Sequence, residues 1–342
     1  MPKRSLSIRI AQVLLCLIPI LYMPGARAAS CTTQAQMTGP QRDALSSAAR
    51  TMLVQMQSGD MLNLKANTLP AVAGDFAGIA SSIQSFSPTL RNATITVDEL
   101  YLLDNSAGTP AASRVDFFCG TPVVVVNFSA LPQGTYALAI LHATGVPEPQ
   151  QVSLILAQSA PDRWMFAGYF RKPMTEAGHD GLWYWVSARK YAQTKMDWAA
   201  WLYYKIAIDL LNPLDFLSSP NMEKLRKEAD GARPPAFPGT QPMMLNASGS
   251  SFRLTAVDIS TAFGGLDLDV HYAPDPAQTA QLRNPMTARQ QVTTVMTALV
   301  DTHPELRSAF HGIWVHADEG NASLFALELP MTGISAGAPQ RP

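Results

Sequence analysis

The chain has 342 residues, of which 47% are hydrophobic and 15% are charged, and its formal net charge is −1. It is too hydrophobic for a disordered protein, and its near-neutral charge offers no basic surface for nucleic acid. These values exclude a DNA-binding protein, a coiled coil and a multi-span membrane protein. At about 150 residues per domain, the length predicts two domains with a connector.

The N-terminus has the pattern of a secretory signal peptide. Lys3, Arg4 and Arg9 form a positive start, 10–22 is apolar, and Ala-Arg-Ala at 26–28 provides a cleavage site. A membrane anchor is the alternative, but a span needs about 20 apolar residues. We therefore expect a signal peptide over 1–28 and a periplasmic or extracellular protein that is not integral to the membrane.

Two cysteines, Cys31 and Cys119, remain after cleavage. An even number of cysteines in an oxidising compartment favours a disulfide between them. Two unpaired thiols are one alternative. Another is a lipobox over 28–31, in which Cys31 would carry a lipid, although Ala28 replaces the usual leucine.

In the first part of the mature chain, the spacing of apolar residues changes from a helical period to strand-like alternation. Apolar spacing predicts a helix over 40–58 and a second helix after Pro70. Six alternating segments, separated by turn residues, then predict strands at 93–103, 114–119, 122–128, 134–144, 151–157 and 163–170. Helices followed by a meander of antiparallel strands indicate an α+β fold.

In length and element order, residues 38–171 resemble the nuclear-transport-factor-two-like (polyketide-cyclase-like) cone. The resemblance implies helices on a strongly curved antiparallel sheet, whose concave face can hold a ligand. His142, on the strand that also carries Tyr136, is then a candidate general base, with Asp116 or Tyr136 as its helper. The alternative is a rim or core histidine with one hydrogen bond.

Residues 181–213 resemble a single tetratricopeptide repeat. Its packing positions match Tyr184, Ala188, Tyr191, Ala200, Tyr204 and Ala207, and Pro213 follows. A further helix is expected after Ser219 and Pro220, so that 178–229 forms a helical hairpin connector. Asp180 is expected to cap the first of these helices by accepting from the amide of Leu182 or Trp183.

Beyond the connector, 230–250 is rich in Pro and Gly and predicts a linker. Strand patterns at 251–259, 265–272, 310–317 and 322–329, with a helix at 286–302, predict a ββαββ domain over 251–330. Residues 331–342 are expected to be a tail. The stretches FFCG, AGHDGLWYW and NPLDFLSSPN make the whole chain similar to uncharacterised secreted bacterial proteins, a resemblance that implies no activity.

Asp267, Asp269 and His271 alternate along one predicted strand and therefore share a face. Two carboxylates and an imidazole are candidate ligands for a divalent cation, or candidates to share a proton transfer. The alternative is a solvated polar face opposite Leu266, Leu268, Val270 and Tyr272, because the sequence shows no further ligand at metal-binding spacing. We therefore assign no metal and no other cofactor.

Trp183, Trp185, Trp198 and Trp201 are four of the six tryptophans and are candidate binding residues. Such aromatic groups can bind a peptide or a glycan. Consecutive aromatic residues surround the helix that begins after Asp180, as expected for a buried helix. The alternative is therefore that these residues form an interdomain core.

We favour a non-catalytic binding or assembly module, with a protein or cell-envelope component as partner, over an enzyme. The alternative is a cone-fold lyase, isomerase or hydrolase that acts on a small apolar ligand through His142.

Overall fold

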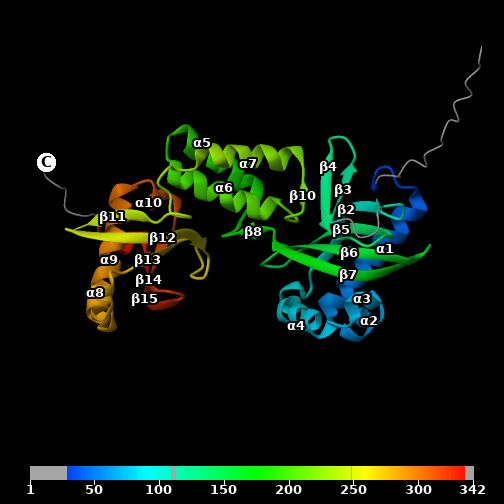
Figure 1. Ribbon diagram of the computed structural model, residues 1–342, viewed down its shortest axis with the longest axis horizontal. Coiled ribbons are helices and arrows are strands. Elements are labelled where there is room, and N and C mark those ends of the chain that lie inside the picture. Colours follow the sequence, from blue (N-terminus) through cyan, green and yellow to red (C-terminus); the bar gives the residue numbers. More distant parts are fainter. Residues whose placement is uncertain (1–28, 109–112, 248, 336–342) are drawn as a thin grey trace, which may run out of the picture.

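The computed structural model describes residues 29–108, 113–247 and 249–335, and the expected signal peptide lies outside them. The protein has the predicted α+β fold, in which two five-stranded sheets lie at opposite ends of the molecule (Figure 1). No helix within the described ranges is long and apolar enough to cross a membrane.

The N-terminal body contains all six predicted strands, with boundaries that differ by at most three residues. Its strands are β1 (Ser30–Thr33), β2 (Thr94–Asp104), β3 (Arg114–Cys119), β4 (Val124–Ser129), β5 (Thr135–Thr144), β6 (Gln150–Ala160) and β7 (Arg163–Pro173). Its helices are α1 (Gly39–Ser58), α2 (Met61–Ala66), α3 (Pro70–Ala73) and α4 (Phe76–Phe86), followed by the 3₁₀ turn η1 (Ser87–Leu90). The single helix expected after Pro70 is thus two helices, which separate at Gly74 and Asp75.

The main N-terminal sheet has the antiparallel order β1-β2-β5-β6-β7 and is buried on both faces. On one face, Leu141 and Leu154 pack with Leu53 of α1. On the other face, Leu138 packs against Phe117, because the β3–β4 hairpin leaves the main sheet and forms a separate one with β10 (Leu217–Ser218). The N-terminal strands therefore form two layers of sheet, and helices cover the outer face of the main sheet.

The predicted disulfide is present between Cys31 and Cys119. Cys31 lies in β1, a four-residue strand that the sequence analysis did not identify and that pairs with the edge of β2. The bond joins this edge strand to β3 in the second sheet. The sulfur of Cys31 is therefore not a free thiol, which excludes both of the alternatives for this residue in this structure.

Three helices follow the first body, namely α5 (Gly181–Gln193), α6 (Asp197–Leu211) and α7 (Pro220–Ala232), preceded by the two-residue strands β8 (Thr175–Glu176) and β9 (His179–Asp180). Asp180 caps α5 as expected, since its Oδ1 accepts from the amide of Trp183 at 2.8 Å. Ser219 likewise caps α7, with Pro220 at its first position.

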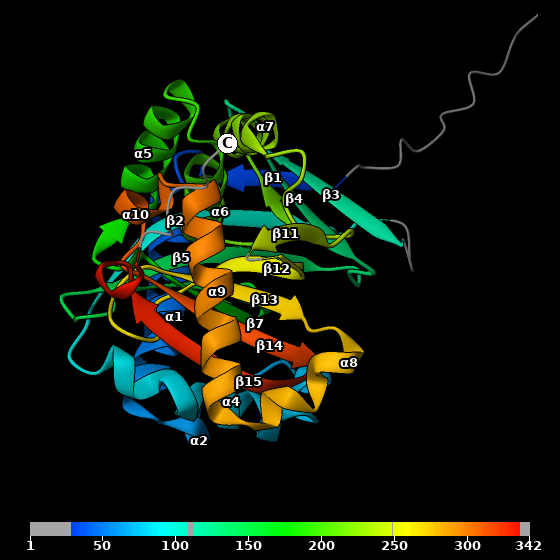
Figure 2. The same ribbon diagram turned by 90° about the vertical axis from the view of Figure 1, so that its left-hand side faces the viewer.

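The C-terminal sheet has the order β11-β12-β13-β14-β15. Its elements are β11 (Met243–Ala247), β12 (Ser250–Ser260), β13 (Asp267–Ala273), α8 (Pro276–Thr279), η2 (Gln281–Arg283), α9 (Pro285–Thr302), α10 (Leu306–Ala309), β14 (Gly312–Glu319), β15 (Ala322–Pro330) and η3 (Met331–Gly333). Helix α9 crosses one face of the sheet (Figure 2) and connects β13 to β14, which run parallel. The other strand pairs are antiparallel.

Two expectations for the C-terminal region are wrong. The linker predicted over 230–250 contains β11, because Leu245 and Ala247 alternate into the core while Met244 remains exposed. The tail expected from residue 331 is packed as far as Ile334, since Met331 and Ile334 are both buried. The Pro and Gly content of these segments predicts loops, but each segment also contains a few apolar residues that are buried in the core.

Helices α5 to α7 share one hydrophobic core with the C-terminal sheet. The hydroxyl of Tyr203 in α6 donates to the carbonyl of Ala309 at 2.7 Å. The ring of Trp198 stacks on His303 with centroids 4.2 Å apart. The helices expected to be a separate connector are therefore continuous with the C-terminal body.

Candidate metal centre

The polar and apolar residues of β13 alternate as predicted. Leu268, Val270 and Tyr272 are fully buried in the core shared with α9. Asp267, Asp269 and His271 therefore lie on the opposite face. Their surroundings are not those of a solvated surface, since Asp267 is 0% exposed and the other two are half-buried.

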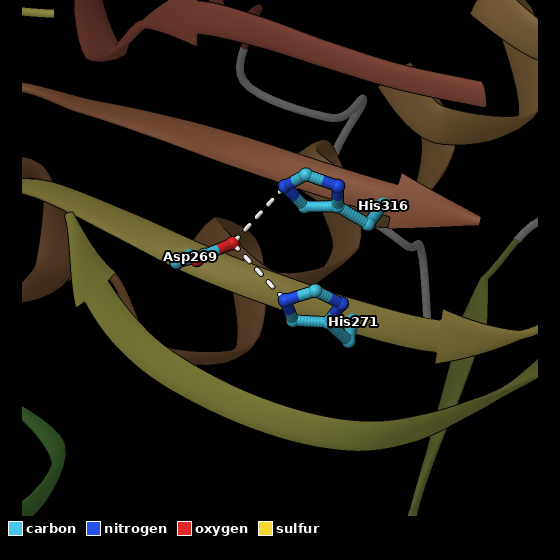
Figure 3. A group of neighbouring side chains, drawn as sticks. All are labelled: Asp269, His271 and His316. Atoms are coloured by element: carbon cyan, nitrogen blue, oxygen red, sulfur yellow. Dashed lines mark ion pairs between the residues drawn. The ribbon is translucent and has the colours of Figure 1, made fainter. Parts of the chain in front are cut away.

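The parallel neighbour β14 brings a second histidine to this face. His316 lies directly beside His271 in the register, and their rings stack with centroids 4.5 Å apart and planes 11° from parallel. Each imidazole presents its Nε2 atom to the same carboxylate oxygen (Figure 3), so that Asp269 Oδ1 is 3.4 Å from His271 and 3.2 Å from His316. We call these three residues the Asp269 cluster.

Asp318 holds one of the two imidazoles in place. Its Oδ2 lies 2.6 Å from Nδ1 of His271. A carboxylate can only accept, so Nδ1 of His271 carries the hydrogen, and in the neutral ring the lone pair is on Nε2. A bulge between Ala317 and Asp318 shifts the register of β14 at this point. The Nε2 atom of His271 is thereby directed at Asp269 as an acceptor.

The atoms that face each other in the cluster lack hydrogen bonds. Neither Oδ1 of Asp269 nor Nε2 of His316 has a hydrogen-bond partner in the described structure, although both atoms are buried. Burial lowers the pKa of His316, a change that nearby His271 reinforces and that Asp269 and Asp318 oppose. His316 is therefore stabilised in its neutral form, which is the form that binds metals.

The geometry suits a small divalent ion. Transition metals bind imidazole nitrogen and carboxylate oxygen at about 2.0–2.2 Å, so that neighbouring ligand atoms lie roughly 3.0–3.5 Å apart. The observed separations of 3.2 and 3.4 Å fall in this range. The carboxylate–histidine pair of Asp318 and His271 matches the outer hydrogen bond that orients metal-binding histidines. Two nitrogens and one oxygen would leave a coordination position for a further ligand.

The sequence predicts Asp267, Asp269 and His271 as candidate ligands, but not His316 or Asp318. These two residues lie more than 40 positions further along the chain. His316 lies on the predicted strand 310–317 and Asp318 directly follows it, but the pairing of this strand with β13 was not predicted. The missing information was the parallel register, which places His316 beside His271.

His142 lies on β5 in the N-terminal body. Its Nε2 atom is 3.4 Å from Oε1 of Gln151 on β6 and 3.8 Å from Oδ2 of Asp98 on β2. The side chain is about one-quarter exposed. His142 thus has polar partners on both neighbouring strands, as a rim histidine would.

The two proposed helpers of His142 have other contacts. Asp116 on β3 forms an ion pair with Arg114 at 2.8 Å. The hydroxyl of Tyr136 donates to the carbonyl of Pro132 at 3.1 Å. None of these bonds joins His142 to Asp116 or Tyr136. A catalytic role for His142 therefore stays a prediction.

The four candidate tryptophans are divided between core and surface. Trp198 is buried in the core shared by α6 and the C-terminal sheet. Trp185 and Trp201 pack against this core and are partly buried, and the Trp185 indole donates to a carboxylate of α7 at 2.7 Å. Trp183 is 40% exposed and stacks on His179 with centroids 3.7 Å apart. A common binding surface for the four stays a prediction.

Comparison with protein-family models, with curated proteins and with solved structures gives no match. The resemblances of 38–171 to a cone fold and of 181–213 to a tetratricopeptide repeat therefore stay predictions. The Asp269 cluster is argued from its own geometry alone.

Proposed function

We propose that this protein is an exported metal-binding module that holds a divalent transition-metal ion through Asp269, His271 and His316. This proposal gives the binding module expected from the sequence a ligand, and it replaces the expectation that no cofactor is needed. The metal would be bound at the face of the C-terminal sheet opposite α9.

The observation that carries the proposal is the pair of opposed acceptors at 3.4 Å. With the hydrogen of His271 on Nδ1, its Nε2 faces the carboxylate oxygen of Asp269. Two acceptors directed at each other in a partly buried place are unfavourable unless a cation or a proton lies between them. A metal ion satisfies both atoms and also the unpartnered Nε2 of His316.

The ligand set favours zinc or a neighbouring first-row ion over calcium or magnesium. Imidazole nitrogen binds zinc, copper, nickel and iron, whereas calcium and magnesium prefer oxygen ligands. Zinc sites with three protein ligands keep a fourth position open. That position can accept water or a group from the partner.

The proposed compartment is the periplasm or the extracellular space. The Cys31–Cys119 disulfide supports it, since such bonds persist in oxidising compartments. The expected partner, a protein or cell-envelope component, is a proposal as well, and the open coordination position is where we propose that it contacts the metal.

The test is a titration of the metal-free mature protein with Co²⁺, followed by visible absorption. We expect Co²⁺ bound at His271 and His316 to give absorption bands that Zn²⁺ removes by displacement. In His316→Ala the bands that this site contributes should be lost, and the affinity of this site should fall by more than the roughly 10- to 100-fold that loss of an outer partner costs.

His142→Ala is the control, because this histidine is also partly buried but lies in the N-terminal body. It should give the wild-type spectrum. Equal spectra for wild type and His316→Ala, or no bands in either, would contradict the proposal.

A further inference from the structure

We propose a second divalent-cation site on the same face of the C-terminal sheet, formed by Asp267, His311 and Glu328. One ligand atom of each residue lies within 4.8 Å of those of the other two. Asp267 is on β13, His311 directly precedes β14, and Glu328 is on β15. This Asp267 cluster shares no residue with the Asp269 cluster, so the two proposals can fail separately.

The buried carboxylate of Asp267 indicates a cation. The residue is 0% exposed, and its Oδ1 lies 3.0 Å from Nδ1 of His311. Its other oxygen, Oδ2, has no hydrogen-bond partner among the described residues, although it is buried. A buried carboxylate is unfavourable unless its charge is paired and its oxygens are satisfied. A second carboxylate, that of Glu328, increases the negative charge at this place.

Two glycines provide the space in which these side chains meet. A Cβ at Gly312 would lie 2.8 Å from both Asp267 Oδ1 and Glu328 Oε1, and equally close to the carbonyl of Leu329. A Cβ at Gly265 would lie 2.5–2.7 Å from atoms of His311. A larger residue at Gly312 would displace Asp267 and Glu328, and a larger residue at Gly265 would displace His311.

The ligand class follows from the donor atoms. Two carboxylates and one imidazole offer more oxygen than the Asp269 cluster does, and such mixed sets bind first-row divalent ions such as Mn²⁺ and Zn²⁺. Asp267 and Asp269 are two residues apart on one strand, which places their Cα atoms about 6.6 Å apart. The face would thus hold two neighbouring ions at separate sets of ligands.

The stoichiometry of Zn²⁺ on the full mature chain tests this inference by native mass spectrometry. We expect two Zn²⁺ ions per wild-type chain, one in Glu328→Gln and one in His311→Ala. The second variant is included because the His311 side chain is 55% exposed, so its removal leaves the core intact. His316→Ala should also hold one ion, and His316→Ala combined with His311→Ala none.

The control is His179→Ala, which removes an exposed histidine from another part of the molecule and should keep two ions. If the wild type binds one ion that His316→Ala abolishes and His311→Ala keeps, the second site is wrong and the first stands. If the single ion is lost in His311→Ala and kept in His316→Ala, the first site is wrong and the second stands. Two ions in both His311→Ala and Glu328→Gln would overturn the second site.

Discussion

Asp318 is the residue that gives the Asp269 cluster its direction. It accepts from His271 at 2.6 Å and so determines which nitrogen of that ring faces Asp269. Without this bond the ring could present either tautomer, or turn away from the carboxylate. An outer partner of this kind acts on the metal through the ligand that it orients.

We therefore expect Asp318→Asn to weaken Zn²⁺ binding by about 10- to 100-fold without unfolding the protein. The amide oxygen of asparagine can still accept from Nδ1, but it lacks the negative charge that strengthens His271 as a ligand. Competition of Zn²⁺ against a chromophoric chelator measures the change.

Asp215→Asn is the matched control for Asp318→Asn. It makes the same change of charge, but Asp215 is exposed, lies between α6 and β10, and pairs with Lys172 at 3.4 Å. This control should stay within about threefold of the wild type, a smaller effect than loss of an outer partner gives. Equal losses in the two variants would show that Asp318 acts only through overall charge.

At the scale of elements, the sequence predicted most helices and strands but not the contacts that form the site. Local periodicity places Asp269 and His271 on one face of a strand, since a strand has a period of two. Local periodicity does not predict that β13 pairs with β14. This pairing is parallel, and it depends on the packing of α9 across one face of the sheet. The His316 ligand could not be predicted for this reason.

The short elements show the same limit. β1 has four residues and carries no alternation long enough to recognise, yet it pairs along β2. Its position was predicted only indirectly, through the Cys31–Cys119 bond. β11 was concealed by its Pro- and Gly-rich neighbours, and its pairing with β12 is what makes it a strand.

We expect replacement of both Cys31 and Cys119 by serine to lower the free energy of unfolding by about 2–5 kcal/mol. The bond closes a long loop, whose ends are 88 positions apart in the sequence, and removes chain entropy from the unfolded state. Urea unfolding followed by circular dichroism measures the loss. Reduction of the wild type should give the same midpoint as the double variant, and an unchanged midpoint would contradict a stabilising role for the bond.

At the scale of the whole molecule, the segment after α6 joins two cores. Trp198 and Tyr203 of α6 are buried with the C-terminal sheet. Leu214 and Leu217, directly after α6, are buried between the two N-terminal sheets. The helices therefore contribute to the packing at both ends of the molecule (Figure 1). We expect the C-terminal body to unfold together with these helices.

His303 makes this joint core sensitive to acid. It follows α9 directly and stacks on Trp198 of α6, with Glu305 at 3.8 Å from its Nδ1 atom. Burial lowers the pKa of His303 below its ordinary value near 6.5. The unfolded chain consequently binds a proton at a higher pH than the folded chain does. The stability from neutral His303 is complete above about pH 6.5 and is lost as the pH falls from there towards the folded-state pKa.

His303→Gln tests this linkage, because glutamine retains a polar side chain but does not titrate. We expect the variant to be less stable than the wild type at pH 7.5, since the ring contact with Trp198 is lost, and to lose less stability than the wild type on acidification to pH 5.5. Urea unfolding at both values gives the two differences. His179→Gln is the matched control, as this imidazole also stacks on a tryptophan but is exposed, and its acid dependence should equal that of the wild type. An unchanged acid dependence in His303→Gln would mean that protonation of other groups governs the acid stability of the shared core.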